Sequence, residues 1–216
     1  MNKKLIVALD FDNASKALNF LNNLDPDKCL VKVGLELFIS EGWRILDLIS
    51  ERGFEIFLDL KLHDIPNTVA KSLKKISNFN VALTTVHLSG GMEMLEAAFS
   101  EKGNIKILGV SILTSLSKKE IFEITDTNFD VYFNNLISIA SSANVDGVVC
   151  SPNELDRLKN FKKLKVVPGI RNDISDDDQK RVMSPTEAYQ KGADFIVVGR
   201  PITKSDDPKK ALELFI

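Results

Sequence analysis

Short β-rich segments alternate with helical segments along the whole chain, and this alternation constrains the fold more than any other feature. Eight segments are rich in β-branched and apolar residues, and they cover 5–11, 30–36, 55–61, 82–88, 105–113, 146–151, 165–170 and 195–200. Between and after them, apolar residues at helical spacing predict helices over 14–24, 41–52, 66–77, 91–101, 130–143, 153–160, 185–192 and 208–215. Start signals such as Ser184-Pro185 and Asp207-Pro208 support several of these helices.

Eight strands that alternate with eight helices indicate parallel pairing through right-handed crossovers. A doubly wound open sheet could hold this number of strands, but closure into a barrel fits the count better. The stretch "LDFDNAS" after the first strand also lacks the glycine-rich fingerprint of dinucleotide-binding open sheets. The sequence contains no linker and no change in composition. We therefore expect an α/β protein, a (β/α)8 TIM barrel, with a single domain over 1–216.

Charge and composition limit the classes of partner. The net charge is −2, and Lys and Arg are scattered, which argues against nucleic acid but leaves room for a small phosphorylated ligand. The first apolar run ends at Asp10, too soon for a signal peptide, and no segment reaches transmembrane length. We therefore expect a cytoplasmic protein without a membrane partner. Cys29 and Cys150 lack metal-ligand spacing, so we expect two reduced core thiols.

The stretch "FLDLKLHDIPNTV" carries three charges inside an apolar strand and its following loop. Side chains alternate along a strand, so Phe57, Asp59 and Lys61 should share one face, and the apolar residues between them should face the helices. Barrel chemistry takes place at the carboxyl ends of the strands, which would put Asp59 and Lys61 at the mouth. Asp64 is out of phase with them and should lie in the loop.

Asp10 and Lys32 should reach the same mouth from the first two strands. Lys32, Asp59, Lys61 and Asp64 would then alternate in charge and could neutralise one another. One interpretation is a buried ion-pair network that serves only the fold, although such networks often add little net stability. The position at the barrel mouth favours a catalytic role instead.

The loops after the seventh and eighth strands read "PGIRNDISDDDQKRVMSP" and "VGRPIT". Barrel enzymes frequently bind phosphate with these two loops. The glycines, Gly169 and Gly199, let backbone N–H groups approach an anion, and Arg171 and Arg200 offer bidentate donors. The sequence therefore predicts a phosphate site here.

Several motifs together resemble the orotidine 5′-phosphate decarboxylase family. They are "VALDF", "VKVG", "DLKLHDIPNTV", "VHLSGG", "LTS", "DGVVCS", "PGIR…DDQKRVMSP" and "VGRPIT", in the family's order along nearly the whole chain. The most specific is "DLKLHDIPNT". The resemblance implies a homodimeric barrel that converts orotidine 5′-phosphate into UMP with no metal and no organic cofactor.

The resemblance also implies a role for each matching position. The implied catalytic residues are Lys61, Asp59, Asp64 and Lys32. The implied substrate-binding residues are Asp10, Lys32, Ile65, Thr68, Thr114, Arg171, Gln179, Gly199 and Arg200. Among them, Asp10 and Lys32 match the ribose-binding pair, Thr114 matches a pyrimidine contact, and Asp64, Ile65 and Thr68 match residues that reach the site of the other subunit. The polar stretch 172–180 is the expected lid over the phosphate.

Two other functions compete with this one. A keto-gulonate 6-phosphate decarboxylase or hexulose-phosphate synthase shares the Asp-x-Lys-x-x-Asp spacing but uses Mg²⁺, and "HDIPNT" and Lys32 argue against it. A non-catalytic nucleotide-binding barrel would usually have lost Lys61. His63 and His87 are expected to be a loop residue and a packed strand-end residue rather than metal ligands.

Overall fold

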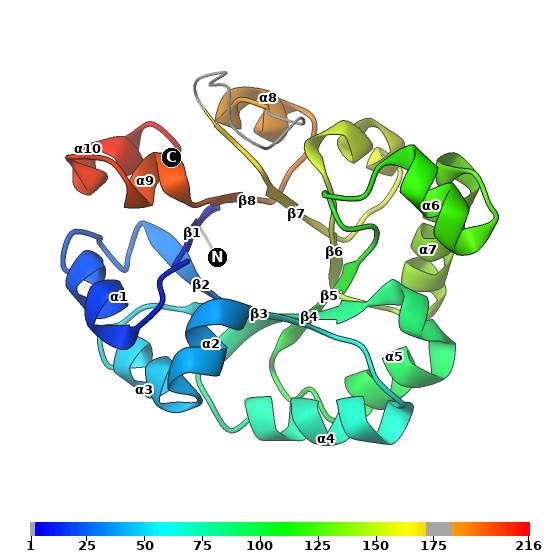
Figure 1. Cartoon of the computed structure of the whole chain (residues 1–216), viewed down its shortest axis with the longest axis horizontal. Helices are drawn as coiled ribbons and strands as arrows, with labels where there is room; N and C mark the ends of the chain where they lie inside the picture. Colours follow the sequence, from blue (N-terminus) through cyan, green and yellow to red (C-terminus); the bar gives the residue numbers. More distant parts are fainter. Residues whose placement is uncertain (1–2, 172–182) are drawn as a thin grey trace.

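The computed structural model describes residues 3–171 and 183–216. It confirms the predicted barrel, because eight parallel strands close in the order β1-β2-β3-β4-β5-β6-β7-β8. The strands are β1 (Leu5–Ala8), β2 (Cys29–Gly34), β3 (Ile56–Leu62), β4 (Val81–His87), β5 (Lys106–Val110), β6 (Gly147–Val149), β7 (Leu164–Pro168) and β8 (Phe195–Val198). Figure 1 shows the ring of strands end-on, with the helices outside it.

Most of the helices connect successive strands and lie around the outside of the barrel, and α9 and α10 follow the last strand. The α-helices are α1 (Ala14–Leu21), α2 (Leu35–Glu41), α3 (Arg44–Ser50), α4 (Pro66–Ile76), α5 (Gly91–Ser100), α6 (Lys118–Thr125), α7 (Phe129–Ser142), α8 (Pro185–Gln190), α9 (Arg200–Thr203) and α10 (Pro208–Glu213). Two 3₁₀ helices are η1 (Leu88–Gly90) and η2 (Pro152–Leu158). Among the residues that the structure describes, no helix is long and apolar enough to cross a membrane.

The apolar side chains form two layers on the two faces of the barrel wall. Ile6, Leu30 and Phe57 belong to the cluster inside the barrel. Ile56 and Leu58 belong to the larger cluster between the strands and the helices. The first half of β3 therefore alternates between the two layers as its sequence predicts. The layers fix the barrel wall and leave the carboxyl ends of the strands for polar residues.

The structure corrects several predicted elements, and the strands predicted over 5–11, 105–113 and 195–200 end earlier, at Ala8, Val110 and Val198. The predicted strand 30–36 ends at Gly34, and the predicted helix 41–52 is replaced by α2 and α3. Gly42 separates these helices with φ 64° and ψ −152°, a backbone conformation that is almost confined to glycine. The segment predicted as a helix over 153–160 is the 3₁₀ helix η2. Its buried leucines are three residues apart, and since this spacing fits both helix types, the sequence pattern does not distinguish them. Neither α6 nor α9 is among the helices predicted from the sequence.

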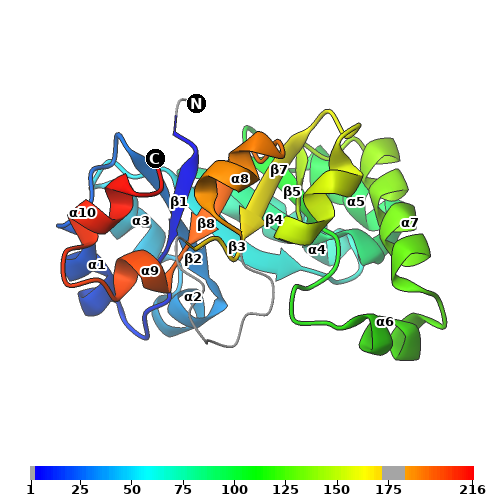
Figure 2. The ribbon, with the colours of Figure 1, turned by 90° about the horizontal axis from the view of Figure 1, so that it is seen from above.

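Figure 2 places α2 and α6 at the same end of the barrel, which is the mouth formed by the carboxyl ends of the strands.

The two cysteines lie away from solvent: Cys29 and Cys150 are both buried and free, as the sequence predicts. Burial raises the pKa of the Cys29 thiol to about 12, and it also raises that of Cys150. Both thiols therefore stay protonated and unreactive at neutral pH.

Replacing Gly42 by Ala tests the backbone conformation that ends α2 at the mouth. No atom lies within 4 Å of the added methyl group, so any cost comes from the backbone conformation alone. We expect the free energy of unfolding to fall by about 1–3 kcal/mol in urea titrations at one protein concentration. Ser40→Ala, on the exposed side of α2, is the matched control and should change it by less than about 0.5 kcal/mol. Equal stability of Gly42→Ala and the control would contradict the assigned conformation.

Candidate active site

The carboxyl half of β3 departs from regular strand geometry. Leu58 pairs with Thr84 of β4 and Leu62 pairs with Val86, so four residues of β3 are matched to two of β4. Lys61, inside this bulge, has φ 52°, a left-handed conformation that costs a non-glycine residue roughly 1–2 kcal/mol. Phe57, Asp59 and Lys61 nevertheless line the same pocket at the mouth, as the alternation predicts, although the backbone between them is not a regular strand.

Two threonines of β4 bond to this bulge. The Thr85 hydroxyl accepts a hydrogen bond from the Lys61 backbone N–H at 2.9 Å and donates one to Asp59 Oδ1 at 3.0 Å. Thr84 donates its hydroxyl to the Leu58 carbonyl at 2.8 Å. Both threonines are fully buried, so these bonds do not compete with water. Sequence reasoning missed this role, and the only signal was the pair of hydroxyl residues in the otherwise apolar run "ALTTVHL".

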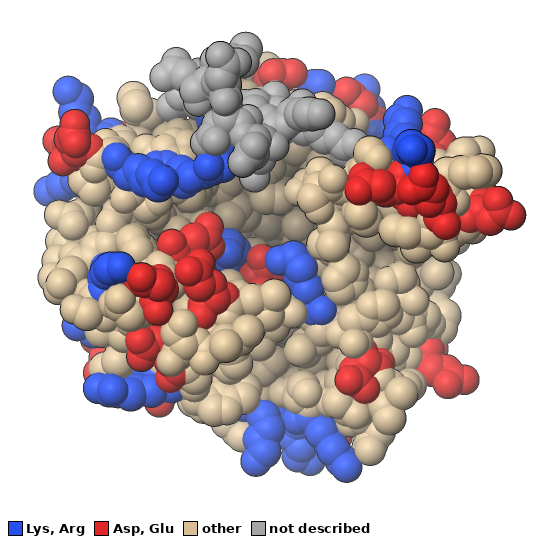
Figure 3. Space-filling view, in the orientation of Figure 1, with Lys and Arg blue, Asp and Glu red and all other residues tan. Residues whose placement is uncertain are grey.

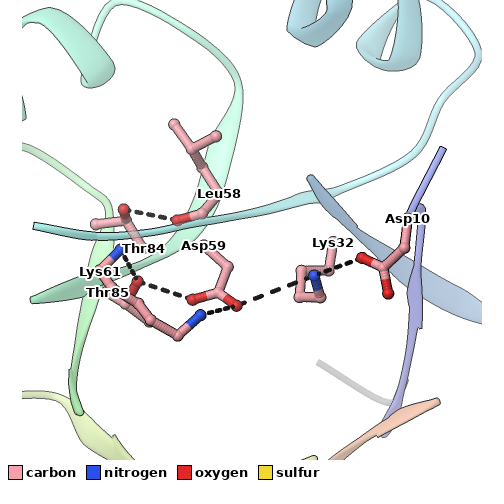
Figure 4. Close-up of polar contacts among 7 residues, drawn as sticks. All are labelled: Asp10, Lys32, Leu58, Asp59, Lys61, Thr84 and Thr85. Atoms are coloured by element: carbon pink, nitrogen blue, oxygen red, sulfur yellow. Dashed lines mark hydrogen bonds and ion pairs between the residues drawn. The ribbon is translucent and has the colours of Figure 1, made fainter. Parts of the chain in front are cut away.

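Four charged side chains follow one another along the floor of the mouth. Lys61 Nζ lies 2.8 Å from Asp59 Oδ2, which lies 4.0 Å from Lys32 Nζ. Lys32 Nζ in turn lies 3.1 Å from Asp10 Oδ1. Figure 4 shows the four in this order, and Figure 3 shows acidic and basic side chains in the central hollow. The side chains of Asp59 and Lys32 are only 12% and 13% exposed, whereas that of Asp10 is 62% exposed. The buried charges are therefore held by their partners, and the network opens to solvent at Asp10.

Three connected pockets meet at Lys32. The first, of about 160 Å³, has apolar walls from Phe57, Val110, Ile112, Val149 and Val197, together with Asp59, Lys61 and the exposed Thr114. It can hold a flat ring against the ammonium group of Lys61. Ser111, at the end of β5, is buried and donates its hydroxyl to the Val149 carbonyl instead of lining this pocket.

The second pocket lies on the other side of Lys32, over the ends of β7 and β8. Gly169, Arg171, Gly199 and Arg200 line it together with Asp10. The structure thus brings together all the described residues that the sequence predicts for phosphate binding. Gln179 and the predicted lid over 172–180 lie outside the described residues.

The third pocket runs from the charged network towards α2. Its walls include Gly34, Leu35 and Glu36, and its floor includes Lys32 and Lys61. Asp64 does not reach this floor within its own chain. Its Oδ1 accepts a hydrogen bond from the Ile65 N–H at 2.7 Å, and no ion pair joins it to another residue of 3–171 or 183–216. Ile65 and Thr68 are likewise exposed on the rim.

The two histidines stack on one another beside the network. Their ring centroids are 5.2 Å apart, with 29° between the ring planes. His87 ends β4 and is partly buried, as the sequence predicts for a packed strand-end residue. In the part of the chain that the structure describes, no group of three His, Cys, Asp or Glu residues is arranged to hold a metal ion.

Comparison with known proteins gives one consistent family. A model described as the orotidine 5′-phosphate decarboxylase / HUMPS family matches residues 3–215. The chain is 45% identical to an orotidine 5′-phosphate decarboxylase of Malacoplasma penetrans, over 99% of this chain and 97% of that protein. It is 43% identical to one of Laribacter hongkongensis, over 96% and 89% of the two chains.

Solved structures agree with the sequence relatives. The crystal structure of an orotidine 5′-phosphate decarboxylase from Lactobacillus acidophilus superimposes with a TM-score of 0.87 at 35% identity, over 99% of this chain and 97% of that one. The names of these relatives favour the nucleotide decarboxylase over the Mg²⁺-dependent sugar-phosphate enzymes considered from the sequence.

Gly34 offers a structural test of the charged network. A Cβ at this position would lie 2.9 Å from Lys32 Nζ and 3.7 Å from Asp10 Oδ1, while the backbone, at φ −94°, accepts any residue. We expect Gly34→Ala to fold with a free energy of unfolding within about 1 kcal/mol of the parent. In its crystal structure the Lys32–Asp10 hydrogen bond should open beyond about 3.5 Å. An unchanged bond would mean that Gly34 does not set the position of Lys32.

Proposed function

The chain belongs to the orotidine 5′-phosphate decarboxylase / HUMPS family, and we propose that it removes CO₂ from orotidine 5′-phosphate to give UMP. The observation that carries this proposal is the position of Lys32. It lies between an apolar pocket that contains Lys61 and a pocket that contains two arginines. A substrate with a flat ring at one end and a phosphate at the other matches this order of pockets.

Each part of the substrate has a complementary set of groups. The pyrimidine ring lies among the apolar walls of the first pocket, within reach of Thr114. The ribose hydroxyls lie over Asp10 and Lys32, which offer an acceptor and a donor already joined to each other at 3.1 Å. The phosphate lies in the second pocket, with Gly199 and Arg200 on one side and Arg171 on the other.

The charges of the two pockets suit an anionic substrate. The first two pockets contain four cationic side chains, Lys32, Lys61, Arg171 and Arg200, and two carboxylates, Asp10 and Asp59. Four minus two leaves an excess of two positive charges around a phosphate and a carboxylate. Binding energy from the phosphate, which does not react, can hold the ring end in place and exclude water.

Lys61 carries the chemistry in this proposal. Loss of CO₂ from C6 leaves an electron pair in the plane of the ring, where ring resonance stabilises it little. The protonated Lys61 amine stabilises that charge and then donates its proton to C6. Asp59, at 2.8 Å, holds the ammonium in place, and Thr85 fixes the other oxygen of Asp59. The proton donor is therefore positioned before the substrate arrives.

Repulsion between Asp59 and the substrate carboxylate is a smaller contribution. Two like charges about 4 Å apart repel by about 4 kcal/mol at an effective dielectric constant of about 20. Enzymes lower barriers by about 8–23 kcal/mol, so this repulsion alone is too weak. Stabilisation of the carbanion by Lys61 must supply the larger share.

The proposal includes a homodimer in which Asp64, Ile65 and Thr68 complete the site of the partner. Ile65 is 65% exposed, and Ile39 of α2 is 77% exposed, with Leu35 and Trp43 also exposed nearby in sequence. Exposed apolar side chains of this size are typical of protein–protein interfaces. The pocket beside Leu35 also leads from α2 to Lys61, which gives a partner carboxylate a route to the ammonium group.

The remaining expectations stay predictions. Residues 1–216 are proposed to form one domain that supplies all groups of the site except those from the partner. The proposed steps use only protein side chains, with no metal and no organic cofactor. Location in the cytoplasm, where buried thiols such as Cys29 stay reduced, is consistent with the free cysteines.

Replacing Arg200 by Ala tests the phosphate end. Loss of a charged hydrogen-bonding partner should cost about 1.5–3 kcal/mol of binding, which raises KM for orotidine 5′-phosphate by about 10–100-fold. Turnover of orotidine, which lacks the phosphate, should change by less than about threefold. Arg52→Ala is the matched control, because Arg52 bonds to the Leu48 carbonyl on the outer helix α3. An equal effect of Arg200→Ala on both substrates would contradict the phosphate assignment.

Mixing two inactive variants tests the shared site. Lys61→Ala and Asp64→Ala should each be nearly inactive alone. A mixed dimer contains one site with both changes and one site with neither, so it should regain activity. With random exchange of equal amounts, about a quarter of all sites should recover.

The measurement is CO₂ release after dissociation in mild denaturant and reassociation. Exchange is verified by mass spectrometry of differently tagged subunits. The control mixes Lys61→Ala with Asp59→Ala. Lys61 and Asp59 belong to the same site of one chain, where the Lys61 Nζ lies 2.8 Å from Asp59 Oδ2. That pair should show no recovery, because every mixed dimer then has one defect in each site. Failure of the Lys61–Asp64 mixture despite exchange would mean that Asp64 acts in its own chain.

A further inference from the structure

The loop that joins Lys61 to Asp64 contains one of the chain's two histidines, and the other lies beneath it. His63 is exposed, yet its ring is not free in solvent, because it stacks on His87 with a centroid distance of 5.2 Å. A Cβ added to Gly90 would lie 3.4 Å from His63 Cδ2, so the backbone of η1 lies beside the same ring. The imidazole of His63 thus lies against the last residue of β4 and beside η1.

The stacked His63 lies between Lys61 and Asp64, the two residues of this loop that belong to the proposed site. On one side, the left-handed backbone of Lys61 donates its N–H to the Thr85 hydroxyl. On the other side, the only hydrogen bond of the Asp64 side chain within 3–171 and 183–216 comes from the next backbone N–H, at Ile65, which is a contact within the loop itself. Between these residues, Leu62 is the last residue of β3, and His63 is the loop residue that packs on β4.

We propose that the His63–His87 stack is a positioning element that holds the loop from Lys61 to Asp64. This one aromatic contact would fix the position of Lys61, the proton donor of its own site, and that of Asp64, the acid offered to the partner's site. The inference rests on the proposed function, since decarboxylation is its readout. In this role the flat ring of His63 matters and its proton does not. A positional error of about 1 Å in a catalytic group costs about 10²-fold in rate.

Protonation of His87 makes the stability of the stack depend on pH. Burial lowers the pKa of His87, and the neighbouring His63 and Lys61 lower it further, while Asp59 opposes them. His87 is therefore neutral at pH 7 and does not add a positive charge beside Lys61. Because the folded-state pKa is depressed, the stability that depends on neutral His87 is present above its ordinary value of 6.5. It is lost as the pH falls from 6.5 through the lower folded value.

The experiment replaces each ring by a non-titrating ring or by no ring. His63→Ala should lower kcat by about 10²-fold and leave KM within about threefold, because the phosphate contacts are untouched. His63→Phe keeps the stack and should retain kcat within about threefold of the parent. Ser89→Ala, an exposed neighbour in η1, is the control and should leave both constants unchanged. Melting curves verify folding, and His63→Gln replaces His63→Ala if the latter is not fully folded.

The pH profile gives a readout that a merely structural role would not change. For the parent, kcat should fall as the pH drops through the lowered folded-state pKa of His87. In His87→Phe this fall should shift or disappear, with kcat near the parent value at pH 7.5. Equal losses in His63→Ala and His63→Phe would show that an imidazole proton is needed and would overturn the proposal. Full activity of His63→Ala would overturn it as well. Failure of the parent to release CO₂ would instead contradict the proposed function.

Discussion

The site depends on the hydrogen bonds of Thr85 to the bulge of β3. Its hydroxyl accepts from the backbone of Lys61 and donates to the carboxylate of Asp59, so one buried side chain fixes both partners of the central ion pair. A regular strand would place successive side chains on opposite faces at fixed spacing. Here a bulge with a left-handed residue interrupts that geometry, and the Lys61 ammonium lies 2.8 Å from Asp59. The barrel, with its two apolar layers, supplies the rigidity that keeps this conformation.

The position of Asp59 in turn determines the order of the charged side chains at the mouth. Asp59 attracts Lys61 directly and Lys32 at 4.0 Å, and Lys32 reaches Asp10 at the open end of the row. Because the two buried charges Asp59 and Lys32 are both partnered, the cost of their burial is offset. The same row divides the mouth into a ring pocket and a phosphate pocket, and this division carries the proposed reaction. Fold, electrostatics and substrate orientation are thus connected through Lys32 and Asp59.

Much of this was predictable from sequence, and the failures have physical causes. The alternation of strands and helices predicted the closed barrel, and the polar strand ends predicted that Asp10, Lys32, Asp59 and Lys61 would meet. The bulge was not predictable, because it depends on Thr84 and Thr85 of another strand, and a period-two pattern contains no information on a neighbour's hydroxyls. The break at Gly42 was missed because glycine also occurs within helices. Asp64 lies in the loop, as predicted, but among the described residues it does not join the row of alternating charges in which the sequence placed it. Its role across an interface stays a prediction, because that role belongs to an assembly of two chains.

The central claim is that Lys61 stabilises a carbanion at C6 and delivers a proton to it. By microscopic reversibility, the same group should remove the C6 proton of the product. The most direct measurement is therefore exchange of the C6 hydrogen of UMP for deuterium in D₂O, followed by proton NMR at saturating UMP. The account predicts exchange with the parent protein and none above background with Lys61→Ala, although both bind UMP. Exchange that persists in Lys61→Ala, or that is absent from the active parent, would contradict it.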